Sequence, residues 1–209
     1  ELWELDARDL RRPQLLRIDP LSGDEVDALP IPADALSYLG LSAPQQHRLR
    51  EPGVQLGFFA DDQRVFLPVD SESITGEPSR MVALSRGDGS VLWRWSGLPG
   101  CVIERAGLQG GTLVVFQKHS DHARLSLLDP ATGLAKGSAF DFGALAAIRN
   151  WDRGPRGGPA PTEVIVVDEV RGASRHLRLT HIAIASGGPR FQIDLDNVIR
   201  VSHDPFVGD

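Results

Sequence analysis

The chain has 209 residues, of which 41% are hydrophobic and 24% charged, and its formal net charge at pH 7 is −6. An acidic balance argues against a nucleic-acid partner, because non-specific nucleic-acid binding depends on a basic surface. No apolar run reaches the length of about 18 residues that a membrane span needs, and the single cysteine, Cys101, allows no intrachain disulfide.

The N-terminal part of the chain predicts strands and a helical insertion. The first ten residues, ELWELDARDL, begin as a strand. In the segment 15–32, LLRIDPLSGDEVDALPIP, apolar and polar residues alternate on both sides of a turn that ends at Gly23, as in a β-hairpin. Residues 32–53 show helical spacing instead, so we predict one or two short helices inserted there.

The pattern of strand, glycine turn and strand recurs three more times along the chain. The later copies are centred on Gly89, Gly133 and Gly187, and a further short strand and polar turn precede each of them. Units of three or four short antiparallel strands, about 40–50 residues long, are typical of propeller blades. We therefore predict an all-β fold with about four antiparallel blades, and treat residues 1–209 as a single β-propeller region.

Between the third and fourth copies, residues 150–161 (NWDRGPRGGPAP) combine glycines and prolines without an apolar period. This composition predicts a long exposed loop, preceded by a short helix at 143–150. Loops on a rigid scaffold often carry binding residues. Trp151, Asp152 and Arg153 are therefore our candidate partner-binding residues; the alternative for Trp151 is packing against the base of its own loop.

The densest group of possible metal ligands is KHSDH, residues 118–122, which contains His119, Asp121 and His122. A hairpin turn could bring the two histidines together, but zinc or iron needs further ligands from elsewhere. We interpret this segment as a solvated turn. DLDN, residues 194–197, has alternating oxygens but lacks the glycine and distal glutamate of a calcium-binding EF-hand loop.

Other polar segments also fall in predicted turns. The carboxylate pairs Asp61–Asp62 and Asp168–Glu169 are expected to be hydrated there, and GLQGG, residues 107–111, is expected to be a turn between blades. Motifs of serine hydrolases, P-loop proteins and zinc proteases are missing from the sequence. We predict no catalytic, cofactor-binding or metal-binding residues.

Three of the repeats, LLRIDPLSG, LSLLDPATG and ALSRGDGSVLWRW, resemble the blade motif of quinoprotein-like (PQQ-repeat) β-propellers. The resemblance implies that the tryptophan of one blade packs over the turn glycine of a neighbour. The second copy keeps this tryptophan as Trp93, whereas the other copies have Ala28, Ser138 and Phe191 near that place. The residues of the structural repeat are Asp19, Gly23, Gly89, Trp93, Asp129, Gly133 and Gly187.

Members of this family generally have more than four blades, so the resemblance implies part of a larger propeller or one completed by another chain. We expect a non-catalytic scaffold or accessory subunit, without a cofactor, that binds a protein partner or further blades from another chain. A similarity to outer-membrane assembly lipoproteins and bacterial sensor domains implies an extracytoplasmic setting. The alternatives are a fragment of a quinoprotein-type oxidoreductase, with its catalytic residues outside this chain, and a propeller that senses a small molecule or glycan.

Overall fold

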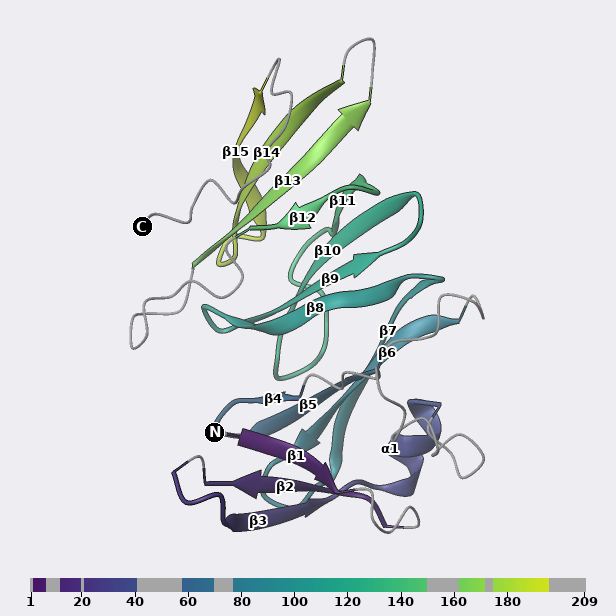
Figure 1. Ribbon diagram of the computed structural model, residues 1–209, viewed down its shortest axis with the longest axis vertical. Helices are drawn as coiled ribbons and strands as arrows, with labels where there is room; N and C mark the ends of the chain where they lie inside the picture. Colours follow the sequence, from purple (N-terminus) through teal and green to yellow (C-terminus); the bar gives the residue numbers. More distant parts are fainter. Residues whose placement is uncertain are drawn as a thin grey trace. The chain divides into compact units, whose positions relative to one another are not determined.

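The computed structural model describes seven stretches of the chain. They are residues 2–6, 12–19, 21–40, 58–69, 77–149, 162–171 and 175–195. Within these stretches the fold is all-β with one short helix, α1 (Ala33–Tyr38) (Figure 1). The expected all-β class with antiparallel sheets is therefore confirmed.

The described strands form four sheets, and in each of them neighbouring strands are also neighbours in the chain. None of these sheets closes on itself. The first sheet consists of β1 (Leu2–Asp6), β2 (Gln14–Ile18) and β3 (Glu25–Pro30). The second consists of β4 (Phe59–Ala60), β5 (Arg64–Val69), β6 (Pro78–Ser85) and β7 (Val91–Pro99). The third consists of β8 (Val102–Gln109), β9 (Thr112–Lys118), β10 (His122–Leu128) and β11 (Phe140–Gly143). The fourth consists of β12 (Ala147–Ile148), β13 (Glu163–Arg171), β14 (Arg175–Ala183) and β15 (Gly188–Leu195).

The last two strands of every sheet are joined by a turn with a glycine in the left-handed region. In the first turn the Gly23 N–H donates to the Asp19 carbonyl at 2.8 Å, and the Asp19 N–H donates to the Asp24 carbonyl at 2.9 Å. Positive φ is accessible to glycine without the strain that a side chain causes, which explains why this position is glycine each time. The four φ angles are 76° at Gly23, 74° at Gly89, 70° at Gly133 and 64° at Gly187.

Three of these glycines pack tightly against the preceding sheet. In each case the contact is a residue that comes after the glycine turn of that preceding sheet. A Cβ built on each of them would come within 3 Å of a neighbouring atom, closer than real contacts allow. At Gly23, by contrast, a Cβ would meet no described atom within 4 Å. The three close approaches are Gly89 to the Pro30 carbonyl oxygen at 2.6 Å, Gly133 to the Trp93 ring at 2.7 Å, and Gly187 to the Lys136 carbonyl oxygen at 2.6 Å.

The chain divides into two compact units, and the first contains residues 1–106 together with 131–133. Its main core lies between the first and second sheets and α1. In β5 the side chains of Val65, Leu67 and Val69 face this core, as alternation along a strand requires. The buried members of this core are Leu15, Leu29, Ile31, Ala35, Leu36, Leu39, Val65, Leu67, Val69, Val82 and Leu84.

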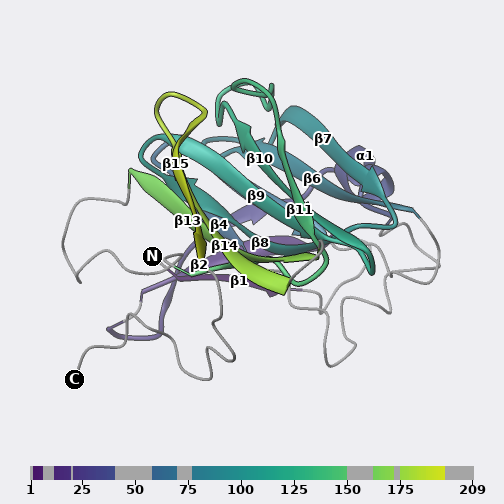
Figure 2. The ribbon, with the colours of Figure 1, turned by 90° about the horizontal axis from the view of Figure 1, so that it is seen from above.

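The helix α1 lies beside β6 and β7 in both ribbon views (Figures 1 and 2). Arg80 of β6 donates from Nη1 to the Tyr38 carbonyl at 2.8 Å, and Arg94 of β7 forms an ion pair with Asp34. This helix accounts for the described part of the insertion predicted at 32–53; residues 41–53 lie outside the described residues.

The opposite face of the second sheet carries a row of side chains across its four strands. Phe59, Phe66, Ala83 and Trp93 are consecutive cross-strand partners. Phe59 stacks on Phe66 with ring centroids 5.0 Å apart, and Phe66 meets Trp93 at 5.8 Å. The small Ala83 leaves room for the two larger rings to meet above it. The row ends at Trp93, whose ring covers Gly133 within the first unit.

The second unit contains residues 107–130 and 134–209. Its core lies between the third and fourth sheets. Apolar residues at every second position of β9, β10 and β13 supply most of it, so the sequence alternation again sets which face is buried. The buried residues are Val114, Phe116, Ala123, Leu125, Leu127, Ala146, Ile148, Val164, Val166, Ile182 and Ile184.

Several local predictions are wrong. Asp168 and Glu169 lie within β13 and not in a turn. Gly110 and Gly111 connect β8 with β9 of one sheet, so GLQGG is not a turn between blades. The described part of segment 143–150 contains a turn and the short strand β12 where we predicted a helix. In these segments strand pairing decides the local structure.

Candidate functional site

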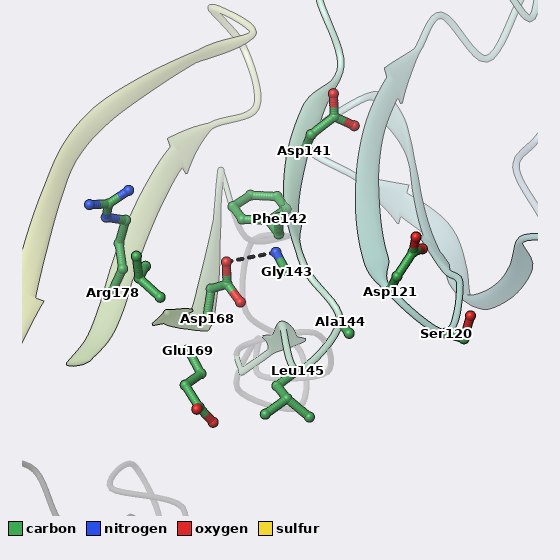
Figure 3. A pocket seen from close by; sticks show the side chains of 11 residues that line it. Ser120, Asp121, Asp141, Phe142, Gly143, Ala144, Leu145, Asp168, Glu169 and Arg178 are labelled. Carbon is green, nitrogen blue, oxygen red and sulfur yellow. Dashed lines mark hydrogen bonds between the residues drawn. The ribbon is translucent and has the colours of Figure 1, made fainter. Parts of the chain in front are cut away.

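A groove of about 710 Å³ lies in the second unit (Figure 3). Carboxylates outnumber cations among its side chains: four acidic residues and one arginine line it. The lining residues are Ser120, Asp121, Asp141, Phe142, Gly143, Ala144, Leu145, Asp168, Glu169, Val170 and Arg178.

Asp168 is the buried acid of this groove, with 7% of its surface exposed. The Gly143 N–H donates to Asp168 Oδ2 at 2.8 Å, the bond drawn dashed in Figure 3. Its other oxygen, Oδ1, is buried and accepts no hydrogen bond from the described residues. It lies against Gly143, where a Cβ would be only 3.0 Å away. A buried carboxylate with one unsatisfied oxygen costs free energy, which marks this position as unusual for a purely structural residue.

The arginine opposite Asp168 does not neutralise it by a direct contact. Arg178 faces Asp168 across the β13–β14 pair, but its guanidinium binds Asp194 through bonds of 2.7 and 3.2 Å. In Figure 3 that guanidinium points away from Asp168. The hydrogen bond to Asp194 raises the pKa of Arg178, with a smaller contribution from the charge of Asp168. The groove therefore keeps a negative field that can attract a cationic group.

A second acid of the groove is held by a cross-strand ion pair. Arg124 of β10 faces Asp141 of β11 and donates to both of its carboxylate oxygens, at 2.6 and 2.9 Å. These hydrogen bonds lower the pKa of Asp141. The charge of Asp141 is therefore already balanced by Arg124, unlike that of Asp168.

At the rim of the groove, Asp121 accepts hydrogen bonds from two histidines. The Nδ1 atoms of His119 and His122 both contact Asp121 Oδ1, the second at 2.6 Å. These bonds lower the pKa of Asp121 to about 2. As the sequence allowed, the hairpin turn brings the two histidines together, and Asp121 joins them from within the same turn.

The three candidate partner-binding residues, Trp151, Asp152 and Arg153, and the loop 150–161 around them lie outside the described residues. The repeat residues Asp19, Gly23, Gly89, Asp129, Gly133 and Gly187 lie in or beside the turns between outer strands, and Trp93 lies in β7. None of these seven repeat residues lines the groove.

Sequence reasoning missed Asp168, although a signal for it exists. In TEVIVVDEV the buried residues Val164 and Val166 occupy alternate positions, and Asp168 is the next on the same face. Extending the strand by two residues would have marked Asp168 as an inward-facing acid.

Among the described residues, no helix is both long enough and apolar enough to cross a membrane. Comparison with models of known protein families found no match, and comparison with curated proteins found no significant match.

Proposed function

We propose that this chain is a non-catalytic, protein-binding scaffold of the β-propeller type, which joins a sheet of another chain through the outer strand β15. The packing of turn glycines against preceding sheets supports the propeller architecture, and the cover of Gly133 by Trp93 supports the resemblance to PQQ-repeat blades. Packing of this kind between sheets can also use a sheet supplied by another chain.

One observation carries the proposal: the position of Trp93 is repeated in β15, but there the aromatic side chain, which stacks on His181 with ring centroids 4.6 Å apart, remains about half exposed. Phe191 is the fourth residue after Gly187, as Trp93 is the fourth after Gly89. Phe191 is 46% exposed, whereas Trp93 is 8% exposed. Ile193, on the same face of β15, is 45% exposed. Large apolar side chains on one face of an outer strand are typical of a surface that binds another protein.

The described residues also offer a complementary surface, the open turn at Gly23. A second copy can place its Gly23 turn on Phe191, in the way that Gly133 receives Trp93 within one chain. Such a contact joins two different surfaces and is therefore heterologous, so it produces rings or larger assemblies.

Light scattering of the 209-residue chain over a range of concentrations tests this function. We expect a mass above that of the monomer that rises with concentration. We expect Phe191→Ser to shift the association to higher concentration by roughly thirtyfold, the effect of losing an aromatic residue at the centre of an interface.

Leu134→Ser is the matched control, because Leu134 lies in the same unit and is 69% exposed. It should associate like the wild type, with circular dichroism showing that both variants fold. A wild-type monomer at every concentration, or equal association of both variants, would refute binding through β15.

A further inference from the structure

The β9–β10 hairpin ends in a tight loop that places two histidines opposite each other. The His119 N–H donates to the His122 carbonyl at 2.8 Å, which leaves Ser120 and Asp121 as the two loop residues. Opposite residues of an antiparallel pair project their side chains on the same face of the sheet. The rings of His119 and His122 accordingly lie 5.0 Å apart.

The ligand atoms of the loop converge on a single point. One ligand atom from each of His119, Asp121 and His122 lies within 4.8 Å of the other two. Both imidazoles direct Nδ1 at the same carboxylate oxygen, Oδ1. Two imidazoles and one carboxylate are a donor set that suits zinc and related ions.

We propose that His119, Asp121 and His122 bind one Zn²⁺ ion at the tip of this hairpin, through Nδ1 of each histidine and a carboxylate oxygen. Zinc lies about 2.0–2.2 Å from such ligands, so the atoms around a tetrahedral ion are roughly 3.3 Å apart. Nδ1 of His122 now lies 2.6 Å from Asp121 Oδ1, so side-chain rotation has to open this pair by roughly 0.7 Å to reach the zinc-bound spacing.

The surroundings of the loop allow these rotations. The side chains of His119, His122 and Asp121 are 35%, 38% and 74% exposed, so no packed core resists their movement. Zn²⁺ takes the place of the hydrogen that each Nδ1 shares with Asp121, and each neutral imidazole then carries its proton on Nε2. Asp121 also lines the groove, from which water can supply the fourth ligand that zinc requires.

Calorimetric titration of the chelator-treated chain with ZnCl₂, together with Co²⁺ absorption spectroscopy, tests the site. We expect one Zn²⁺ per chain and visible d–d bands typical of tetrahedral Co²⁺. His119→Gln, His122→Gln and Asp121→Asn should each weaken zinc binding by at least about tenfold, because even residues behind the direct ligands have effects of this size.

His176→Gln is the control, since His176 lies in the same unit and its described acidic partner is Asp194, at 3.7 Å. It should bind zinc as tightly as the wild type. Because none of the three ligands is buried, circular dichroism of their variants should match that of the wild type. Absence of zinc binding by the wild-type chain, or unchanged affinity in both His119→Gln and His122→Gln, would overturn the proposal.

Discussion

Gly143 lies so close to Asp168 that a side chain added there would make a tight contact. An added Cβ would be 3.0 Å from Asp168 Oδ1 and 3.5 Å from the Glu169 carbonyl oxygen. Because Asp168 is buried, we expect Gly143→Ala to lower the free energy of unfolding by about 1–3 kcal/mol, the usual cost of overpacking. Urea denaturation measures this difference.

Gly87→Ala provides the comparison. Its added Cβ would meet only Ser85 Oγ, at the ordinary distance of 3.8 Å, and Gly87 does not have positive φ. We expect its unfolding free energy to stay within about 0.5 kcal/mol of the wild type. Equal losses in Gly87→Ala and Gly143→Ala would show that Asp168 is not tightly packed against Gly143.

Single residues of the candidate site differ in how far the sequence predicts them. The convergence of His119 and His122 follows from hairpin geometry alone, because cross-strand partners share a face. The burial of Asp168 follows from the alternation of β13 once the strand is known to continue through it. The close approach of Gly143 does not follow from the sequence, because β11 and β13 are not neighbouring strands of one sheet.

At the scale of elements, the turns that join the last two strands of each sheet distinguish two reasons for glycine, which are positive φ and close packing. Gly23 and Gly133 have φ angles of 76° and 70°, so an alanine suffers similar backbone strain at either position. Only Gly133 also faces the Trp93 ring, which an added Cβ would approach to 2.7 Å. We expect Gly133→Ala to lose about 1–3 kcal/mol more unfolding free energy than Gly23→Ala.

Thermal and urea unfolding of these two variants provide the measurement. The difference between them isolates the packing between adjacent sheets, because the strain in the turn cancels. Equal destabilisation would mean that the Trp93 ring moves aside at no cost, and that this contact contributes little to the first unit.

Elements with clear alternation and a glycine turn are the ones that the sequence predicts. The strands on either side of Gly89 are examples, because β6 and β7 are long and their turn is short. By contrast, β12 has two residues, too few for a period. The third repeat also misleads: beyond an isolated bridge at Ala135, its second strand does not begin until Phe140.

For the molecule as a whole, acid should reduce stability through a few paired carboxylates. Hydrogen bonds lower the pKa of Asp88, Asp121, Asp141 and Asp194 below the ordinary 3.8, that of Asp121 to about 2. A depressed pKa in the folded state adds stability above the ordinary value, and this stability is lost as the pH falls through the folded value.

We therefore expect the urea concentration at the unfolding midpoint to decrease as the pH is lowered from 4 to 2. Between pH 7 and pH 5 we expect it to change little. These bounds bracket the ordinary value of 3.8 and the value of about 2 for Asp121. The double variant Asp141→Asn, Asp194→Asn should show a shallower decline, because two of the responsible groups no longer titrate. An equal decline in wild type and double variant would assign the acid sensitivity to other groups.

Each sheet of the molecule is built from strands that follow one another in the chain. Its strand pairs therefore close short loops, which costs less chain entropy than joining distant segments. Low contact order favours rapid folding, so a sheet can form soon after its own residues leave the ribosome, before the later repeats exist. This order of events protects the outer strands from pairing with the wrong repeat, a characteristic error of repeat proteins.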